Sequence, residues 1–396
     1  MSDFNELGNK PKMVKIIITN GHRNLNSCSF RALNEAKYLQ TKGYDVELII
    51  LQNKEIGKKI VSNKIDGIYT KHYICRSKQM NQALEKNNLI RNFKVLVYFM
   101  WFIKFSVWLR KYIKNTKTDF LQCHNLTSVV AGWIARNQSK LIFVMRENYE
   151  DQAGITNKFK RFFIKNINEF MQNKSNWLIH VTPQQINKTT YQNKHKVIYI
   201  PNYSSVDQYM HIEKTFSNQL RINYIGSVRD YKSLKMLMDA GHHLEGIQIG
   251  IHGLGEEYLK LKNEETVYKN VEITGYYDYK SETEKLYQNT DIIYCVYNIE
   301  IQNWRESRPI KFYESMLTIT PVISCYEMSV SELIIKYDVG FLFHYDNLDE
   351  LRELVSTLVK NPEIIEEKKK NITKIKDNFT WESVVKRLDI IYEGHQ

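Results

Sequence analysis

The sequence has few cysteines and no long apolar run. The five cysteines, at positions 28, 75, 123, 295 and 325, are widely spaced and include no CxxC pair. This spacing argues against a disulfide framework or a zinc site and fits a reducing compartment. The N-terminus has no apolar stretch of the signal-peptide kind, and the longest apolar run, residues 95–103, is too short to span a bilayer. We therefore expect a cytoplasmic protein.

Acidic residues are scarce in the first half of the chain. Residues 1–204 contain 33 Lys or Arg against 13 Asp or Glu, a net charge of +20, whereas residues 205–396 carry −8. A basic half joined to an acidic half indicates two domains with different partners. The basic half is expected to meet something anionic: a membrane surface, an acidic glycan or nucleic acid. Nucleic acid is disfavoured, because no helix-turn-helix, RRM or zinc pattern occurs.

What remains is the composition of a globular protein, with 43% hydrophobic and 25% charged residues. Residues 15–19 and 45–51 are β-branched runs typical of buried parallel strands, and a helical pattern over residues 30–41 connects them. This βαβ opening is followed by further alternation of strands and helices. The pattern predicts an α/β fold with doubly wound sheets.

The stretch ESRPIKFYESM, residues 306–316, is the strongest functional signal. Pro309 suits a first helical position, and Arg308 before it is pushed toward an extended conformation. The pattern predicts a loop followed by a helix. Free N–H groups at that helix N-terminus suit a diphosphate, and the carboxylates of Glu306 and Glu314 on either side suit sugar hydroxyls.

Two glycine turns in the same half each follow a predicted strand. Gly226 is followed by Arg229 and Lys232, and Gly253 opens the second turn. A strand, a tight glycine turn and cations at a helix start are what a pyrophosphate requires.

Together these motifs resemble the donor site of retaining GT-B glycosyltransferases of the family-4 type, also described as glycosyl transferases group 1. The resemblance implies that Glu306 contacts the transferred sugar and that Glu314 binds the ribose of the nucleotide. Arg229 and Lys232 would hold the diphosphate. The remaining donor-side residues implied by the resemblance are Lys311, Arg308, Pro309, Gly226, Gly253 and Gly21.

The first half resembles this family more loosely. DFLQCHNL is similar to the family's D-x-x-H-x-H strand end, with Gln122 at the first His and His124 at the second. LIFVMRENYE is similar to D-x-H-E, with Arg146 in place of the His and Glu147 at the acid. Because arginine cannot accept a proton, Arg146 is expected to hold a phosphate or a carboxylated acceptor. For each of these residues a purely structural role is the alternative.

The family resemblance implies a GT-B fold, in which two Rossmann-like domains face each other across a cleft. Residues 1–204 would bind the acceptor, residues 205–375 the sugar nucleotide, and a helix over residues 376–396 would cross back to the first domain. The expected reaction moves a sugar, with retention, from a UDP-sugar rather than a GDP-sugar to an anionic or lipid-linked glycan in cell-envelope polysaccharide synthesis. No Asp-x-Asp motif occurs, which disfavours metal-dependent GT-A enzymes, so no metal or other cofactor is expected.

Two questions stay open at this point. Arg146 and the sparse glycines of the first loop also fit a non-catalytic GT-B subunit that binds glycan or supports a partner glycosyltransferase. The helical segments 93–113 and 157–174 mix aromatic and basic residues. They are either core helices or partly exposed faces that contact lipid at the inner face of the cell membrane.

Overall fold

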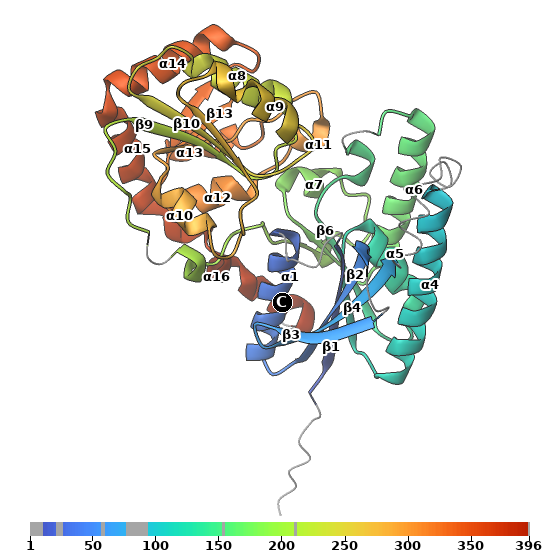
Figure 1. Ribbon diagram of the computed structural model, residues 1–396. Coiled ribbons are helices and arrows are strands. Elements are labelled where there is room, and N and C mark those ends of the chain that lie inside the picture. The colour runs from blue at the N-terminus through green and yellow to red at the C-terminus, as the bar shows by residue number, and fades with distance from the viewer. Residues whose placement is uncertain are drawn as a thin grey trace, which may run out of the picture. The chain divides into compact units, whose positions relative to one another are not determined.

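The chain folds into two α/β units, each built around its own sheet (Figure 1). The computed structural model describes residues 11–20, 27–56, 60–76, 94–152, 155–209 and 212–394. The first unit holds the residues up to Glu150 and Asn157–Ile200, and the second holds Asp151–Thr156 and the residues from Pro201 onward. The predicted α/β fold with two doubly wound sheets is confirmed.

Among the described residues of the first unit, eight strands form a sheet in the order β3-β4-β2-β1-β5-β6-β7-β8. Their bounds are β1 Met13–Asn20, β2 Asp45–Ile56, β3 Ile60–Ile65, β4 Ile68–Arg76, β5 Phe120–His124, β6 Lys140–Met145, β7 Trp177–His180 and β8 Val197–Tyr199. Neighbouring strands are parallel, except that β3 and β4 form an antiparallel hairpin at one edge. The sequence pattern did not predict this hairpin.

Helices cover both faces of the first sheet. Their bounds are α1 Ser27–Thr41, α4 Lys94–Asn115, α5 Leu126–Ala135, α6 Lys158–Lys174 and α7 Pro183–Lys188. Helices α4, α5 and α6 pack on one face, where Phe105 of α4 and Met171 of α6 join Cys123 of β5 in one core. Because side chains alternate along a strand, Gln122 and His124 point to the opposite face, where they meet α1.

In the described part of the second unit, six parallel strands follow the order β11-β10-β9-β12-β13-β14. Their bounds are β9 Leu220–Ile225, β10 Ile247–His252, β11 Val271–Gly275, β12 Ile292–Tyr294, β13 Val322–Cys325 and β14 Gly340–Phe343. The strand order reverses between β9 and β12. In open parallel sheets, ligands bind beyond the carboxyl ends of the strands at such a switch point. Gly226 follows β9 directly, and the segment after β12 leads to Glu306.

The helices of the second unit lie around this sheet (Figure 1). Their bounds are α8 Tyr231–Gly241, α9 Tyr258–Glu264, α10 Thr283–Gln288, α11 Gln302–Arg305, α12 Ile310–Leu317, α13 Ser331–Tyr337, α14 Leu348–Lys360 and α15 Pro362–Ile375. Pro309 is the N-cap of α12, with ψ of 145°, rather than its first helical residue. In place of one helix over residues 376–396, the described residues form short helical turns that include α16 Trp381–Val384 and α17 Asp389–Tyr392, and they group with the second unit.

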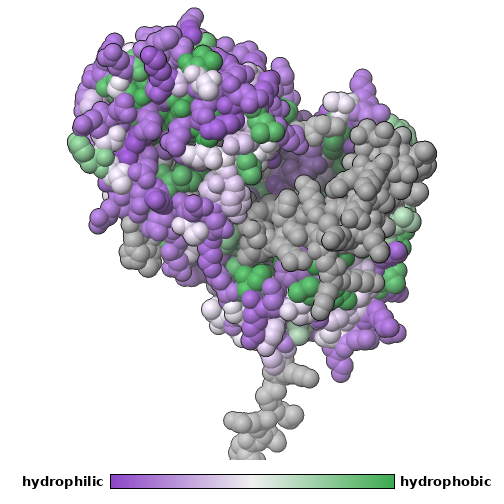
Figure 2. Space-filling view, viewed as in Figure 1, coloured by the Kyte–Doolittle hydropathy of each residue, from purple (hydrophilic) through white to green (hydrophobic). Residues whose placement is uncertain are grey.

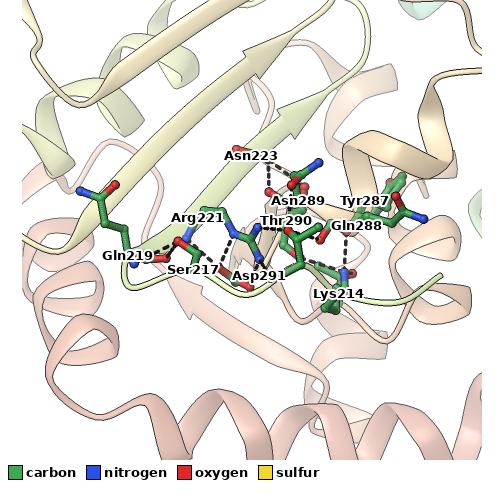
Figure 3. A network of polar contacts seen from close by, with 12 residues as sticks. Lys214, Ser217, Gln219, Arg221, Asn223, Tyr287, Gln288, Asn289, Thr290 and Asp291 are labelled. Atoms are coloured by element: carbon green, nitrogen blue, oxygen red, sulfur yellow. Dashed lines mark hydrogen bonds and ion pairs between the residues drawn. The ribbon is translucent and has the colours of Figure 1, made fainter.

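A polar network fixes the segment that enters the second sheet (Figure 3). Arg221 of β9 forms a bidentate ion pair with Asp291, its Nε and Nη2 lying 3.0 and 2.9 Å from the two carboxylate oxygens. The Lys214 ammonium donates to the carbonyl oxygens of Tyr287 and Thr290, at 2.7 and 2.8 Å. The end of a helix leaves such carbonyls without partners, so Lys214 completes the end of α10. Burial lowers the pKa of Lys214 to about 7.

Candidate donor and acceptor sites

Two glycine turns lie against each other at the carboxyl ends of β9 and β10. Gly226 and Gly253 have φ of 144° and 141°, a region that residues with a Cβ rarely adopt. A Cβ on Gly253 would lie 1.8 Å from the carbonyl oxygen of Gly226. The close approach of the two backbones therefore requires glycine at position 253.

The two predicted diphosphate cations have different neighbours. Arg229 is exposed, and its guanidinium carbon lies 5.5 Å from the ring centroid of Trp304 on α11. Lys232 is also exposed, and its Nζ lies 2.7 Å from Asp346 Oδ2, a bond that raises the pKa of Lys232. An exposed ion pair of this kind contributes little to stability and is easily exchanged. Arg229 thus lies beside the loop that leads to Glu306, whereas Lys232 uses one of its three N–H donors on Asp346.

Lys311 is a buried cation in the first turn of α12. The residue is 3% exposed, and its Nζ makes no hydrogen bond with the described residues. Nζ lies 3.2 Å from the ring centroid of Tyr224 and would lie 3.4 Å from a Cβ on Gly226. Burial lowers the pKa of Lys311 to about 7. Helix α12 has no side-chain cap, so its N–H groups and this ammonium together favour an anion beside Gly226.

Glu314 lies inside the second unit. The residue is 2% exposed, Tyr279 donates a hydrogen bond to its Oε1, and Tyr287 donates to its Oε2 at 3.0 Å. Burial raises the pKa of Glu314, although the tyrosine hydroxyls act to lower it. Each carboxylate oxygen keeps a second lone pair. The predicted ribose hydroxyl would therefore have to bind Glu314 beside Tyr279 or in its place.

Glu306 and Arg308 lie on the loop between α11 and α12. Glu306 is partly exposed and accepts a hydrogen bond from Gln302 Nε2 at 3.0 Å. Arg308 Nη2 lies 2.9 Å from Glu332 of α13. Arg229 contacts Trp304, which lies just before Glu306 in the chain, so Arg229 lies beside the loop that carries Glu306. Their roles toward a sugar nucleotide stay predictions.

In the first unit, His124 belongs to a buried network with α1. Its Nε2 lies 2.8 Å from Glu35 Oε2, and Arg31 Nε lies 2.9 Å from Glu35 Oε1. Burial raises the pKa of Glu35, but His124 and Arg31 outweigh it and lower that pKa to about 2. Burial lowers the pKa of His124. We infer that a neutral imidazole donates Nε2–H to Glu35 and that Arg31 supplies the positive charge. His124 Nδ1 has no hydrogen-bond partner among the described residues and is the atom left for a ligand.

Arg146 and Glu147 follow β6. Arg146 is partly exposed, and its charge adds to the effect of burial in lowering the pKa of His124 and of Arg31, so it lies close to their network. Glu147 is exposed. Gly21, the predicted glycine of the first loop, lies outside the described residues.

Two pairs of residues that surround the predicted site residues His124 and Glu314 were not themselves predicted. The pairing of Arg31 with Glu35 could have been predicted from the sequence, because opposite charges four residues apart share one side of a helix. Tyr279 and Tyr287 donate hydrogen bonds to Glu314. The sequence could not have predicted them, since they lie in different segments of a chain with 26 tyrosines.

The described part of the chain shows no metal site, no membrane-spanning helix and no reactive cysteine. There, no group of three or more His, Cys, Asp or Glu is arranged to hold a metal ion. No described helix is both long and apolar enough to cross a membrane. Cys123, Cys295 and Cys325 are buried free thiols whose pKa burial raises, so none offers a thiolate near neutral pH.

Comparison with known proteins identifies the second domain. Residues 205–377 match the family model described as glycosyl transferases group 1, which confirms the predicted enzyme class, a glycosyltransferase. No curated protein matches the chain by sequence.

Solved glycosyltransferases share the architecture of the chain. Sucrose-phosphate synthase from Thermosynechococcus elongatus is 12% identical with a TM-score of 0.75, covering 97% of this chain and 98% of that one. A glycosyltransferase from Rickettsia africae is 14% identical with a TM-score of 0.66, covering 98% and 99%. HepE from Anabaena, in complex with UDP and glucose, is 12% identical with a TM-score of 0.66, covering 97% and 100%. These similarities confirm the GT-B fold.

Proposed function

We propose that the protein is a cytoplasmic, retaining glycosyltransferase of the family-4 type that uses a UDP-sugar without a metal. Lys311 is the observation that carries the proposal. It is a buried ammonium without a hydrogen-bond partner among the described residues, placed between the Gly226 turn and the uncapped N-terminus of α12. A buried ammonium that meets aromatic rings but makes no hydrogen bond is costly, so an anionic ligand would stabilise this arrangement.

The reaction class follows from what such a site stabilises. When the bond between the sugar and the diphosphate breaks, negative charge grows on the departing diphosphate, and fixed cations lower the energy of that state. Lys311 and Arg229 would supply them, and Lys232, which gives one of its three N–H donors to Asp346, would add a third cation. Glu306, partly exposed on the adjoining loop, suits hydroxyls of the sugar. The similar HepE structure holds UDP and glucose, which favours UDP here.

The acceptor would bind to the first unit. That half of the chain carries +20, Arg146 lies close enough to His124 to lower its pKa, and the buried His124 Nδ1 has no hydrogen-bond partner among the described residues. A basic site with a hydrogen-bond acceptor suits an anionic or lipid-linked glycan, as in cell-envelope polysaccharide synthesis.

Release of the nucleoside diphosphate, UDP or GDP, from a panel of UDP- and GDP-sugars, with EDTA present, tests this proposal. We expect turnover of at least one UDP-sugar that persists in EDTA, and NMR of the product should show the anomer of the donor. Lys311→Met should abolish release, while Lys336→Met, at an exposed position on α13, should not. Full activity of Lys311→Met would remove the basis of the proposal.

A non-catalytic subunit is the second candidate. It is favoured by the two tyrosines that already occupy Glu314 and by Arg146 at the position of the family's His. This candidate predicts that UDP binds but that no sugar nucleotide is hydrolysed or transferred.

A further inference from the structure

Helix α4 is apolar on two sides, and the sheet covers only one of them. Phe105 and Leu109 are buried against the sheet. Phe99, Ile103 and Val107, which follow one another every four residues on another side, are 58%, 45% and 63% exposed. A helix that is hydrophobic all round is normally buried, so the outer stripe indicates a contact outside the first unit.

Helix α6 shows the same feature more strongly. Phe159, Phe162 and Phe163 in its first two turns are 77%, 65% and 58% exposed, and their spacing of three and four residues places them on neighbouring positions of the helix surface. Helix α5 contacts both α4 and α6, so the three helices form one layer over the sheet. Phe170 of α6 packs edge-on against Trp133 of α5, with ring centroids 5.5 Å apart.

The charge of this layer has one sign. In their sequences α4 and α6 each contain five Lys or Arg, and the single acidic residue of the three helices is Glu169. Exposed Lys111 and Lys114 continue the outer side of α4 beyond Val107, and Lys158 and Lys160 flank Phe159. Figure 2 shows hydrophobic atoms along the edge of the molecule where Figure 1 draws α4 and α6.

We propose that this surface docks on an anionic lipid bilayer. We call it the α4–α6 face and define it by Phe99, Ile103, Val107, Phe159, Phe162 and Phe163. Phenyl rings enter the interfacial region of a membrane, and ammonium groups beside them meet anionic headgroups. A nucleic acid would bind the cations but would not contact the apolar stripe of α4. An anionic bilayer accounts for both the cations and the apolar stripe.

Vesicle flotation of the full chain tests the proposal. At low salt the protein should float with vesicles of equimolar phosphatidylcholine and phosphatidylglycerol, and it should leave them as salt rises. The triple variant Phe159→Ser/Phe162→Ser/Phe163→Ser should lower the partition coefficient on the order of a hundredfold. Lys158→Gln and Lys160→Gln should each lower it about fivefold. Phe216→Ser, at a 90% exposed position of the second unit, is the matched control and should change nothing.

The replaced side chains are exposed, so the variants should keep the unfolding temperature of the wild type. Failure of the wild type to float with anionic vesicles at low salt would overturn the proposal. So would flotation of the triple variant at the wild-type level. A dimer of the wild type that the triple variant abolishes, without flotation, would assign the face to a second copy of the chain instead.

Discussion

Replacing Lys311 with Met tests whether the second unit keeps an unpaired charge for its ligand. Met keeps most of the side-chain volume beside Tyr224 and removes the ammonium. Burial lowers the pKa of Lys311 from 10.5 to about 7, so the folded protein binds fewer protons than the unfolded chain between these values. Stability therefore rises with pH across this window, and protonation below pH 7 costs the folded state about 5 kcal/mol at most. Lys311→Met should be more stable than the wild type by a few kcal/mol at pH 6 and by much less at pH 10.

The same substitution changes how UDP binding depends on pH. A diphosphate in contact with Nζ favours the ammonium form and raises the pKa of Lys311 in the complex. Above about pH 7 the free protein must take up a proton to bind, and its affinity then falls by up to about tenfold per pH unit. We expect a loss on the order of 10- to 100-fold from pH 7 to pH 9 in the wild type and nearly none in Lys311→Met. The terminal phosphate titrates near pH 6, below this range.

Two measurements check this prediction. Urea unfolding of both proteins from pH 6 to pH 10 gives the stability difference, in which the contribution of Lys214, also with a pKa of about 7, cancels. Calorimetry with UDP in buffers of different ionisation enthalpy gives the proton uptake directly. The exposed control Lys336→Met should keep the wild-type profile. Equal proton uptake by the wild type and Lys311→Met, or a pH-independent affinity of the wild type, would refute the assignment of Lys311 to the diphosphate.

Four further substitutions test the other residues. Glu314→Ala should weaken UDP binding by up to about fivefold in calorimetry, because it removes a hydrogen bond to the ribose; an unchanged affinity contradicts that role. Arg229→Ala and Lys232→Ala should lower kcat more than they raise KM in steady-state kinetics, since charge grows on the leaving diphosphate; a change in KM alone means ground-state binding only. Glu35→Ala should cost about 3–5 kcal/mol in urea unfolding, because it removes the buried carboxylate that forms an ion pair with Arg31. With a pKa of about 2, Glu35 stabilises the wild type fully above about pH 4.3 and loses this effect as pH falls through 2.

The sequence predicts those parts of the fold whose cause is local. The runs at residues 15–19 and 45–51 became β1 and β2 because buried parallel strands consist of continuous apolar residues. The hairpin β3–β4 was missed because its edge strand, Ile60–Ile65, is mostly exposed and has no apolar period. Asp66 and Gly67 between the strands have φ of 48° and 83°, the values of a two-residue hairpin turn. An Asp-Gly pair is the signal that predicts such a turn.

The predicted site residues divide in the same way, into those whose conformation has a local cause and those whose surroundings depend on distant segments. The glycine turns at Gly226 and Gly253 could be predicted, because a backbone with positive φ after a strand favours glycine, whereas their role in binding a donor stays a prediction. The surroundings of Lys311 were not predicted, because they depend on rings from elsewhere: Nζ lies 3.2 Å from the centroid of Tyr224 and 5.1 Å from that of Tyr297. A helix pattern places a lysine on a face, but only the packed strands decide whether its charge meets water.

Glu314 shows what such non-local contacts mean for binding. Its two oxygens already accept hydrogen bonds from Tyr279 and Tyr287, which stand where hydroxyls of a ribose would also donate. If a ribose replaces Tyr279, one hydroxyl is exchanged for another, and the net gain is at most about 1 kcal/mol. On the proposed function, the larger share of UDP affinity would then come from the diphosphate, whose charge would meet the ammonium of Lys311, which makes no hydrogen bond with the described residues. Lys311→Met should therefore weaken UDP binding at pH 7 more than Glu314→Ala does, and the reverse order would place the main binding energy at the ribose.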